Sequence, residues 1–223
     1  MRLLVVSDPH SSAPNAELLA NMLSKAKIDA VLVCGDFTNE GSVSIAEEIV
    51  TSLGKIAKVY AVPGNMDSEE VAGFLRQKGI GMHKEKKKLG DYVIIGIGGA
   101  KPINTYYRIN LSESEAEKYL NRLSEGEKPE KTILLFHSPP YGTRLSMSSS
   151  GTDLGVMAIR AFIEKFQPLL VACGHVHEAI GIEKIGRTVC INPGPLRDGF
   201  YAIAEISGSG EIKITRGSVY GKE

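Results

Sequence analysis

The sequence predicts a single α/β domain with a mixed arrangement of β-strands. In the first half of the 223-residue chain, short continuous apolar runs alternate with stretches of helical periodicity. This rhythm is typical of strands that helices cover on both faces. From residue 179 onward, short strands separated by glycine-containing turns predominate instead. No linker, repeat or low-complexity tract divides the chain, and its length is sufficient to bury a sizeable core.

Five helices are predicted, and most have a recognisable start or stop signal. Pro14 opens the first, Ser42 is the N-cap of the second, and Gly54 ends the second. A Ser-x-x-Glu capping box at Ser112 opens the fourth, and the fifth ends before Pro168. The predicted helices cover residues 14–26, 42–53, 68–78, 112–123 and 159–166. The apolar face of the first is predicted to hold Leu18, Leu19, Met22, Leu23 and Ala26.

The predicted strands cover residues 3–6, 30–34, 59–62, 92–97, 132–136, 169–173, 179–185, 188–192, 199–206 and 211–216. The lysine-rich segment 84–88 is predicted as a solvated turn between strands, with a nucleic-acid patch as the less favoured alternative. The Ser- and Gly-rich segment 141–155, together with Tyr106 and Tyr107, is either a lid over a functional site or a mobile loop without a catalytic task.

Composition and charge limit the classes of partner. The 26 basic and 26 acidic residues cancel, so no global field attracts DNA or an anionic membrane. The first apolar run, residues 3–6, is too short for a signal-peptide core or a membrane span, and no longer one follows. Three cysteines, Cys34, Cys173 and Cys190, lie among apolar residues without a CxxC motif, as is typical of a reducing compartment. We therefore expect a cytoplasmic protein, monomeric or homo-oligomeric, that binds neither membrane nor nucleic acid.

Polar side chains follow five of the predicted strands, at the point where each strand ends. They are Asp8 and His10, Asp36, Asn65 and Asp67, His137, and His175 and His177. In an open α/β sheet, ligands bind beyond the carboxyl ends of the strands. If the five strands are parallel, their side chains face one crevice.

Hard oxygens mixed with imidazole nitrogens, and no thiolate, are the ligands of divalent metal ions. The number of ligands is too high for one ion and suits two, with Asp36 as the natural bridge. Two divalent ions with Asp8 and Asp36 leave a charge of about +2, or about +1 with a bridging hydroxide, which favours a phosphoryl group. Two metals ~3.5–4 Å apart recur where a metal-bound water attacks phosphorus in line.

The ordered motifs resemble those of the calcineurin-like metallophosphoesterases. They read DxH at 8–10, GD at 35–36, GNxD at 64–67, a lone His137 and GHxH at 174–177. The resemblance runs from residue 3 to about 195 and includes every metal-binding position. The segment HSPPYGT at 137–143, with GHVHE at 174–178 and NPG at 192–194, is most similar to the small prokaryotic branch of Icc-related phosphoesterases.

The resemblance implies a four-layer fold, in which two mixed sheets form a sandwich with flanking helices. It implies hydrolysis of a small phosphate ester by a metal-bound hydroxide at a dinuclear site. The first metal would be bound by Asp8, His10, Asp36 and His177, and the second by Asp36, Asn65, His137 and His175. The metals would be two Mn2+ ions, with Fe, Zn2+ or Ni2+ as alternatives. Asp36, Asn65, His137 and Asp67 are the candidate catalytic residues, although the role of Asp67 is left open.

One position departs from the family pattern. Many members have histidine where this chain has Met66, and that histidine is thought to assist phosphate binding or protonate the leaving group. Methionine has no proton to donate, and general acid catalysis typically contributes ~10²–10⁴-fold. The expected substrates are therefore phosphodiesters with good leaving groups.

Three arginines could in principle reach a bound phosphate. Arg108, Arg144 and Arg197 lie in predicted loops, where a surface position is favoured over contact with a bound phosphate.

The alternative to an enzyme is a non-catalytic, protein-binding scaffold of the same fold, in which metal ligands are eroded. Because no metal-binding position is lost here, the sequence favours the enzyme.

Overall fold

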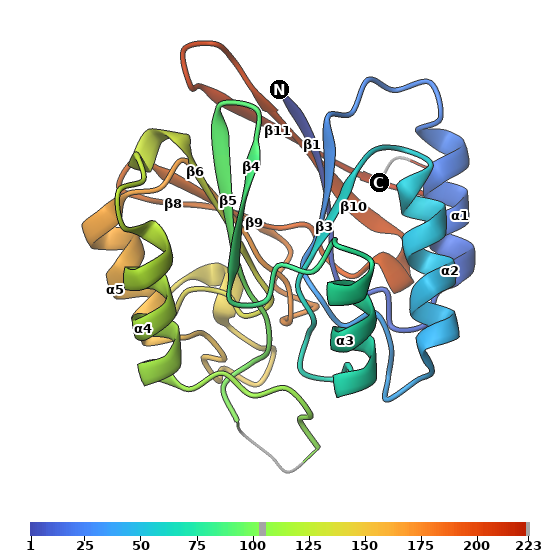
Figure 1. Ribbon diagram of the computed structural model, residues 1–223, viewed down its shortest axis with the longest axis horizontal. Helices are drawn as coiled ribbons and strands as arrows, with labels where there is room; N and C mark the ends of the chain where they lie inside the picture. The colour runs from blue at the N-terminus through green and yellow to red at the C-terminus, as the bar shows by residue number, and fades with distance from the viewer. Residues whose placement is uncertain (103–105, 222–223) are drawn as a thin grey trace.

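The computed structural model describes residues 1–102 and 106–221, which form two β-sheets packed face to face with helices on both outer faces (Figure 1). The five-stranded sheet has the order β11 (Ile212–Ser218), β10 (Phe200–Ile206), β1 (Arg2–Val6), β2 (Ala30–Val33) and β3 (Val59–Ala61). The six-stranded sheet has the order β4 (Glu85–Leu89), β5 (Tyr92–Ile97), β6 (Thr132–Phe136), β7 (Leu170–Ala172), β9 (Thr188–Asn192) and β8 (Gly181–Ile185). In the five-stranded sheet β1, β2 and β3 are parallel, and the pairings of β10 with β1 and β11 are antiparallel. The six-stranded sheet has a parallel centre, from β5 to β9, and an antiparallel strand at each edge. The predicted sandwich of two mixed sheets is confirmed.

The helices divide between the two outer faces. Helices α1 (Ala13–Met22), α2 (Val43–Gly54) and α3 (Glu69–Gln77) cover the five-stranded sheet, while α4 (Glu113–Ser124) and α5 (Met157–Phe166) cover the other (Figure 1). Short 3-10 turns lie at Pro129–Lys131, Arg144–Ser146 and Leu196–Asp198. The capping box predicted at Ser112 is present, with reciprocal hydrogen bonds between Ser112 and Glu115.

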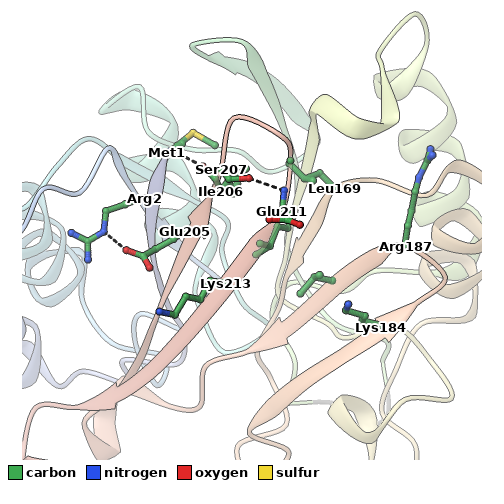
Figure 2. Close-up of a pocket in the computed structure, with 13 residues that line it drawn as sticks. Met1, Arg2, Leu169, Lys184, Arg187, Glu205, Ile206, Ser207, Glu211 and Lys213 are labelled. Carbon is green, nitrogen blue, oxygen red and sulfur yellow. Dashed lines mark hydrogen bonds and ion pairs between the residues drawn. The ribbon is translucent and has the colours of Figure 1, made fainter.

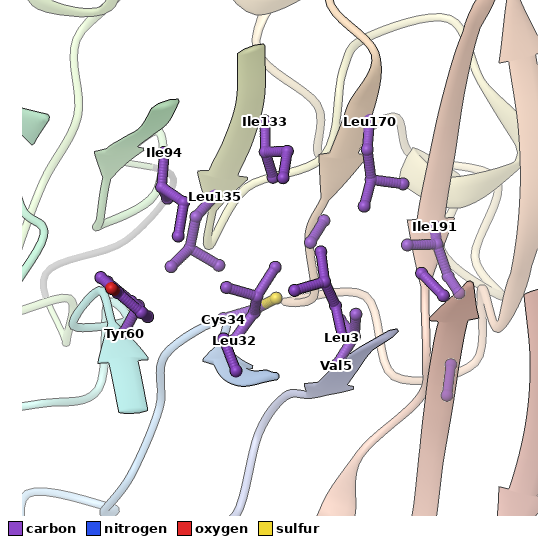
Figure 3. Packing of buried hydrophobic residues seen from close by; sticks show 14 of the residues in the cluster. Leu3, Val5, Leu32, Cys34, Tyr60, Ile94, Ile133, Leu135, Leu170 and Ile191 are labelled. Atoms are coloured by element: carbon purple, nitrogen blue, oxygen red, sulfur yellow. The ribbon is translucent and has the colours of Figure 1, made fainter. Parts of the chain in front are cut away.

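Three apolar layers follow from the alternation of side chains along the strands. Leu3 and Val5 of β1 point into the layer between the sheets, where they meet Ile133 and Leu135 of β6 (Figure 3). Their neighbour Leu4 points the other way, against the helices. Both faces of the central strands are therefore buried, which is why they read as continuous apolar runs.

The lysine-rich segment 84–88 is not a turn; that prediction was wrong. Residues Glu85–Leu89 form β4, which pairs antiparallel with β5 at the edge of the six-stranded sheet. Lysines on an edge strand stay solvated and discourage pairing with another chain. Lys86 forms an ion pair with Glu127, and Lys87 donates to the carbonyl groups of Gly79 and Gly81. A sequence rich in Lys can thus form a strand because its backbone pairs on only one side.

The predicted apolar face of the first helix was also wrong in part. Leu19 and Leu23 are buried, but Leu18 and Met22 are each 46% exposed. The buried face contains Asn15, whose side-chain amide donates to the carbonyl groups of Leu196 and Arg197. A polar contact to the 3-10 turn at 196–198 therefore rotates the helix relative to its most hydrophobic stripe.

A metal-ligand cluster between the two sheets

The predicted site residues come from strands of both sheets. β1, β2 and β3 belong to the five-stranded sheet, whereas β6 and β7 belong to the other. The loop after β1 runs beside the loop after β2, because Asp8 N donates to Gly35 O at 3.0 Å and His10 N to Asp36 O at 2.9 Å. Between the sheets, His137 Nδ1 lies 2.7 Å from Cys34 O. These bonds join the loops after β1, β2 and β6 at one edge of the sandwich, and Gly174 N, in the loop after β7, donates to His137 O at 2.9 Å.

One group of ligands converges on Asp8. His10 Nε2 and His177 Nε2 lie 2.9 Å apart, and they lie 3.7 Å and 3.3 Å, respectively, from Asp8 Oδ1. The three side chains offer ligand atoms that all lie within 4.8 Å of one another. This is the spacing of donors around a single metal ion.

A second group forms around Asp36. Its Oδ2 atom lies 3.5 Å from His137 Nε2 and 3.8 Å from His10 Nε2, so Asp36 stands between the two groups. Asn65 Oδ1 lies 2.7 Å from His137 Nε2. The ring of His175 packs against that of His137 with centroids 5.0 Å apart, and its backbone N–H donates to Asp8 Oδ2. All seven predicted ligands therefore meet in one cluster.

The backbone of the ligand loops is held in an uncommon conformation. Asp8, His10, Asp36 and His175 have φ values of 51°, 44°, 52° and 70°, in the left-handed region. Residues other than glycine rarely adopt such angles, and the cost is of order 1–3 kcal/mol each. The concentration of these angles at the cluster indicates that side-chain placement there is maintained at the expense of stability.

Two of the histidine ligands have partners that the sequence patterns did not identify. Asn39 Oδ1 contacts His10 Nδ1, and Cys34 O contacts His137 Nδ1. These carbonyl oxygens can accept a hydrogen bond from each Nδ1 atom, and that tautomer would leave the Nε2 atoms to bind a metal ion. A signal for Asn39 existed in the sequence, since it lies three residues after Asp36.

Asp67 lies beneath the cluster rather than in it. Its fully buried carboxylate accepts from the backbone N–H groups of Gly64, Phe37 and Thr38 at 2.8, 3.2 and 2.9 Å, and contacts the Thr38 hydroxyl. It thereby ties the loop that carries Asp36 to the loop that carries Asn65. Burial raises the pKa of Asp67 to about 6, although these hydrogen bonds act to lower it.

The charges in the cluster fit a divalent cation. Burial would raise the pKa of Asp8, but the neighbouring imidazoles, His177 foremost, outweigh it and lower the pKa. Burial and the charge of Asp8 hold the pKa of Asp36 well above its ordinary value. In addition, Asp8 Oδ1 is buried and has no hydrogen-bond partner within the described part of the chain. An orphaned carboxylate oxygen beside converging imidazoles suits a bound metal ion.

Metal binding is expected to release a proton from Asp36. Because burial and the charge of Asp8 raise its pKa, Asp36 keeps its proton to a higher pH than an ordinary aspartate, and a bound metal ion would displace that proton. Burial lowers the pKa of His10 to about 4 and that of His175 to about 3, so neither holds a proton at neutral pH. Affinity for Mn2+ should therefore increase as pH rises.

Calorimetric titration with Mn2+ at pH 7, in two buffers of different ionisation enthalpy, measures this release. We expect the binding heat to depend on the buffer in the wild type, because a proton is released, and to depend on it less in Asp36→Asn. A binding heat that does not depend on the buffer would contradict the prediction.

The three candidate arginines have different surroundings. Arg108 forms an ion pair with Glu40 at 2.7 Å, and Arg144 Nε lies 3.9 Å from Glu183. Arg197 donates its backbone N–H to Asp8 O, and its charge is one of the causes that lower the pKa of His10. Of the three, Arg197 is thus the one whose charge acts on a predicted metal ligand in the structure.

A separate hollow of about 640 Å³ lies at the other ends of the strands (Figure 2). Arg2, at the start of β1, lines it together with Leu169, which precedes β7. The ion pair between Arg2 and Glu205 forms part of its wall (Figure 2). Because the ligand cluster follows the carboxyl ends of β1 and β7, this hollow is distinct from it.

No helix in the described ranges combines the length and the apolar character needed to cross a bilayer.

The chain is similar to known proteins in sequence and in fold. The model of the calcineurin-like phosphoesterase family matches residues 1–179. The uncharacterized protein MJ1162 of Methanocaldococcus jannaschii is 33% identical over 202 residues, which cover 87% of this chain and 88% of that protein. The crystal structure of TT1561 of Thermus thermophilus has a TM-score of 0.75 at 20% identity, with 98% of both chains covered. A dimetal phosphatase from Danio rerio has a TM-score of 0.71 at 10% identity, with 98% of this chain and 96% of that one covered.

Proposed function

Because the chain belongs to the family of calcineurin-like phosphoesterases, we propose that it hydrolyses phosphodiesters at a site for two divalent metal ions. The observation that carries this proposal is the position of Asp36. Its carboxylate lies within 4 Å of ligand nitrogens from both groups, 3.8 Å from His10 and 3.5 Å from His137. A carboxylate in this place can bridge two ions. The similar fold of a protein described as a dimetal phosphatase also supports two metals.

The residues of the cluster divide into two ligand sets. In our proposal, Asp8, His10, Asp36 and His177 hold the first ion, and Asp36, Asn65, His137 and His175 hold the second. Two bound ions would polarise the phosphoryl oxygens and acidify the attacking water. Asp67 keeps Asp36 and Asn65 in register through its hydrogen bonds to Gly64, Phe37 and Thr38. The mixture of carboxylate, carboxamide and imidazole suits Mn2+, with Fe, Zn2+ and Ni2+ as alternatives.

The preference for diesters is proposed from Met66. Its backbone N–H donates to Asp36 Oδ1 at 2.7 Å, so this residue helps to orient the bridging carboxylate. Its thioether has no proton for a leaving group. The expected substrates are therefore phosphodiesters whose leaving group departs without a proton from a side chain at this position. A cytoplasmic location is part of the proposal, supported by three buried free cysteines.

Kinetics on the Mn2+-loaded protein test the proposed function. We expect kcat/KM to be higher for an aryl phosphodiester than for an alkyl phosphomonoester. Met66→His should restore a proton donor and raise kcat/KM for the alkyl monoester by up to ~10²–10⁴-fold. Met22→His, at a site 46% exposed on α1, is the matched control and should have no effect. A wild-type preference for the alkyl monoester would refute the diester assignment.

A further inference from the structure

Tyr107 is held over the ligand cluster by the residue that follows it. The backbone N–H of Arg108 donates to Asn65 O at 2.8 Å, and the guanidinium group of Arg108 contacts Glu40 at 2.7 Å. Glu40 in turn donates its backbone N–H to Met66 O at 3.1 Å. The segment that carries Tyr107 is therefore joined to the loops that carry Asn65 and Asp36.

The side chain of Tyr107 turns toward the cluster. Its ring meets that of His175 edge-on, with centroids 5.8 Å apart and planes inclined by 79°. The side chain is half-buried, whereas its neighbour Tyr106 is 69% exposed. The ring thus forms part of the wall of the site and remains partly accessible.

The phenol group is available as a hydrogen-bond donor. A phenol has an ordinary pKa of about 10 and therefore keeps its proton at neutral pH. The edge-on contact with His175 places the phenol ring beside one of the predicted metal ligands. A neutral phenol can donate one hydrogen bond to an oxygen that carries negative charge.

We propose that Tyr107 is a substrate-binding residue, whose hydroxyl donates a hydrogen bond to an oxygen of the phosphoester bound at the cluster. The inference rests on the proposed function and adds a residue to it that no motif identified. The neighbouring position 66 carries a thioether, which cannot donate. Tyr107 places a donor at the same site from a different loop.

Tyr107→Phe tests this role, because it removes the hydroxyl and retains the ring that packs against His175. The probe is inorganic phosphate, titrated calorimetrically into the Mn2+-loaded protein. A hydrogen bond to a charged group corresponds to roughly a 10–100-fold loss of phosphate affinity. We expect kcat/KM for the aryl diester to fall by a similar factor, with unchanged Mn2+ stoichiometry and Tm. Tyr119→Phe on α4, where the ring lies against Lys84 and Arg122, is the control and should match wild type.

The outcomes separate this inference from the proposed function. Wild-type phosphate affinity in Tyr107→Phe would overturn the inference, and so would a loss of Mn2+, which would indicate a role in the metal site instead. If the wild type binds phosphate with the help of Tyr107 but hydrolyses no ester, the proposed function fails and the inference stands. If the wild type binds no phosphate, both fail.

Discussion

Asp36→Asn is expected to lower kcat/KM for phosphoester hydrolysis by about 10²–10³-fold or more, since loss of a single preorganised electrostatic group already has an effect of this size. Asp36 lies 3.8 Å from His10 Nε2 and 3.5 Å from His137 Nε2, so it serves both groups of ligands. Asparagine retains the shape of the side chain and removes the charge that two cations would share. We therefore expect the Mn2+ content to fall below that of wild type.

The metal-free variant should remain as stable as the metal-free wild type. Because the pKa of Asp36 is raised well above its ordinary value, the metal-free fold disfavours the charged carboxylate, and a neutral amide of the same shape should be tolerated there. Thermal unfolding in the presence of a chelator measures the stability of the metal-free variant. Metal analysis and kinetics measure the expected losses of Mn2+ and of kcat/KM. Asp91→Asn, in the exposed turn between β4 and β5, is the matched control. Full activity in Asp36→Asn would exclude Asp36 as a bridging ligand.

Gly64→Ala is expected to lower activity strongly by displacing Asp36. A Cβ atom at position 64 would overlap both the backbone nitrogen and the carboxylate oxygen Oδ1 of Asp36. The two loops cannot move apart freely, because Asp36 Oδ1 accepts from Met66 N at 2.7 Å and Gly64 N donates to Asp67 at 2.8 Å. Overpacking of this kind typically destabilises a protein by about 1–3 kcal/mol. We expect weaker Mn2+ binding and a lower Tm, in addition to a loss of kcat/KM comparable to that of Asp36→Asn.

Gly54→Ala provides the comparison for this substitution. Gly54 ends α2, and a Cβ atom there would meet nothing within 4 Å. Alanine should be neutral or stabilise the helix by up to about 1 kcal/mol. Calorimetric unfolding and metal analysis of the two variants side by side test the argument. If Gly64→Ala retained wild-type Mn2+ affinity, the close approach of the two loops would not matter for metal binding.

Many of the strands and helices, and all of the candidate metal ligands, could be predicted from the sequence. Continuous apolar runs such as residues 3–6 and 132–136 indicated strands buried on both faces, and the structure confirms β1 and β6 there. The cluster residues could be singled out because their chemistry is local: several carboxylates and imidazoles directly after strands are candidate metal ligands and catalytic groups. The capping box at Ser112 could be predicted for the same reason, since Ser112 and Glu115 lie within one helical turn.

Other features depended on contacts between distant segments. Residues 85–89 form a strand because their backbone pairs with β5 on one side, while the other side is the edge of the sheet. The buried face of α1 depends on the hydrogen bonds from Asn15 to Leu196 and Arg197, which are distant in the sequence. Tyr107 reached the cluster only because Arg108 bonds to Asn65 and Glu40. Local propensity and ligand chemistry are properties of neighbouring residues, so the sequence by itself determined the elements and the candidate ligands. Only the tertiary structure could decide which remote groups satisfy a given polar atom or cover a given face, because that depends on which segments come within about 4 Å of each other.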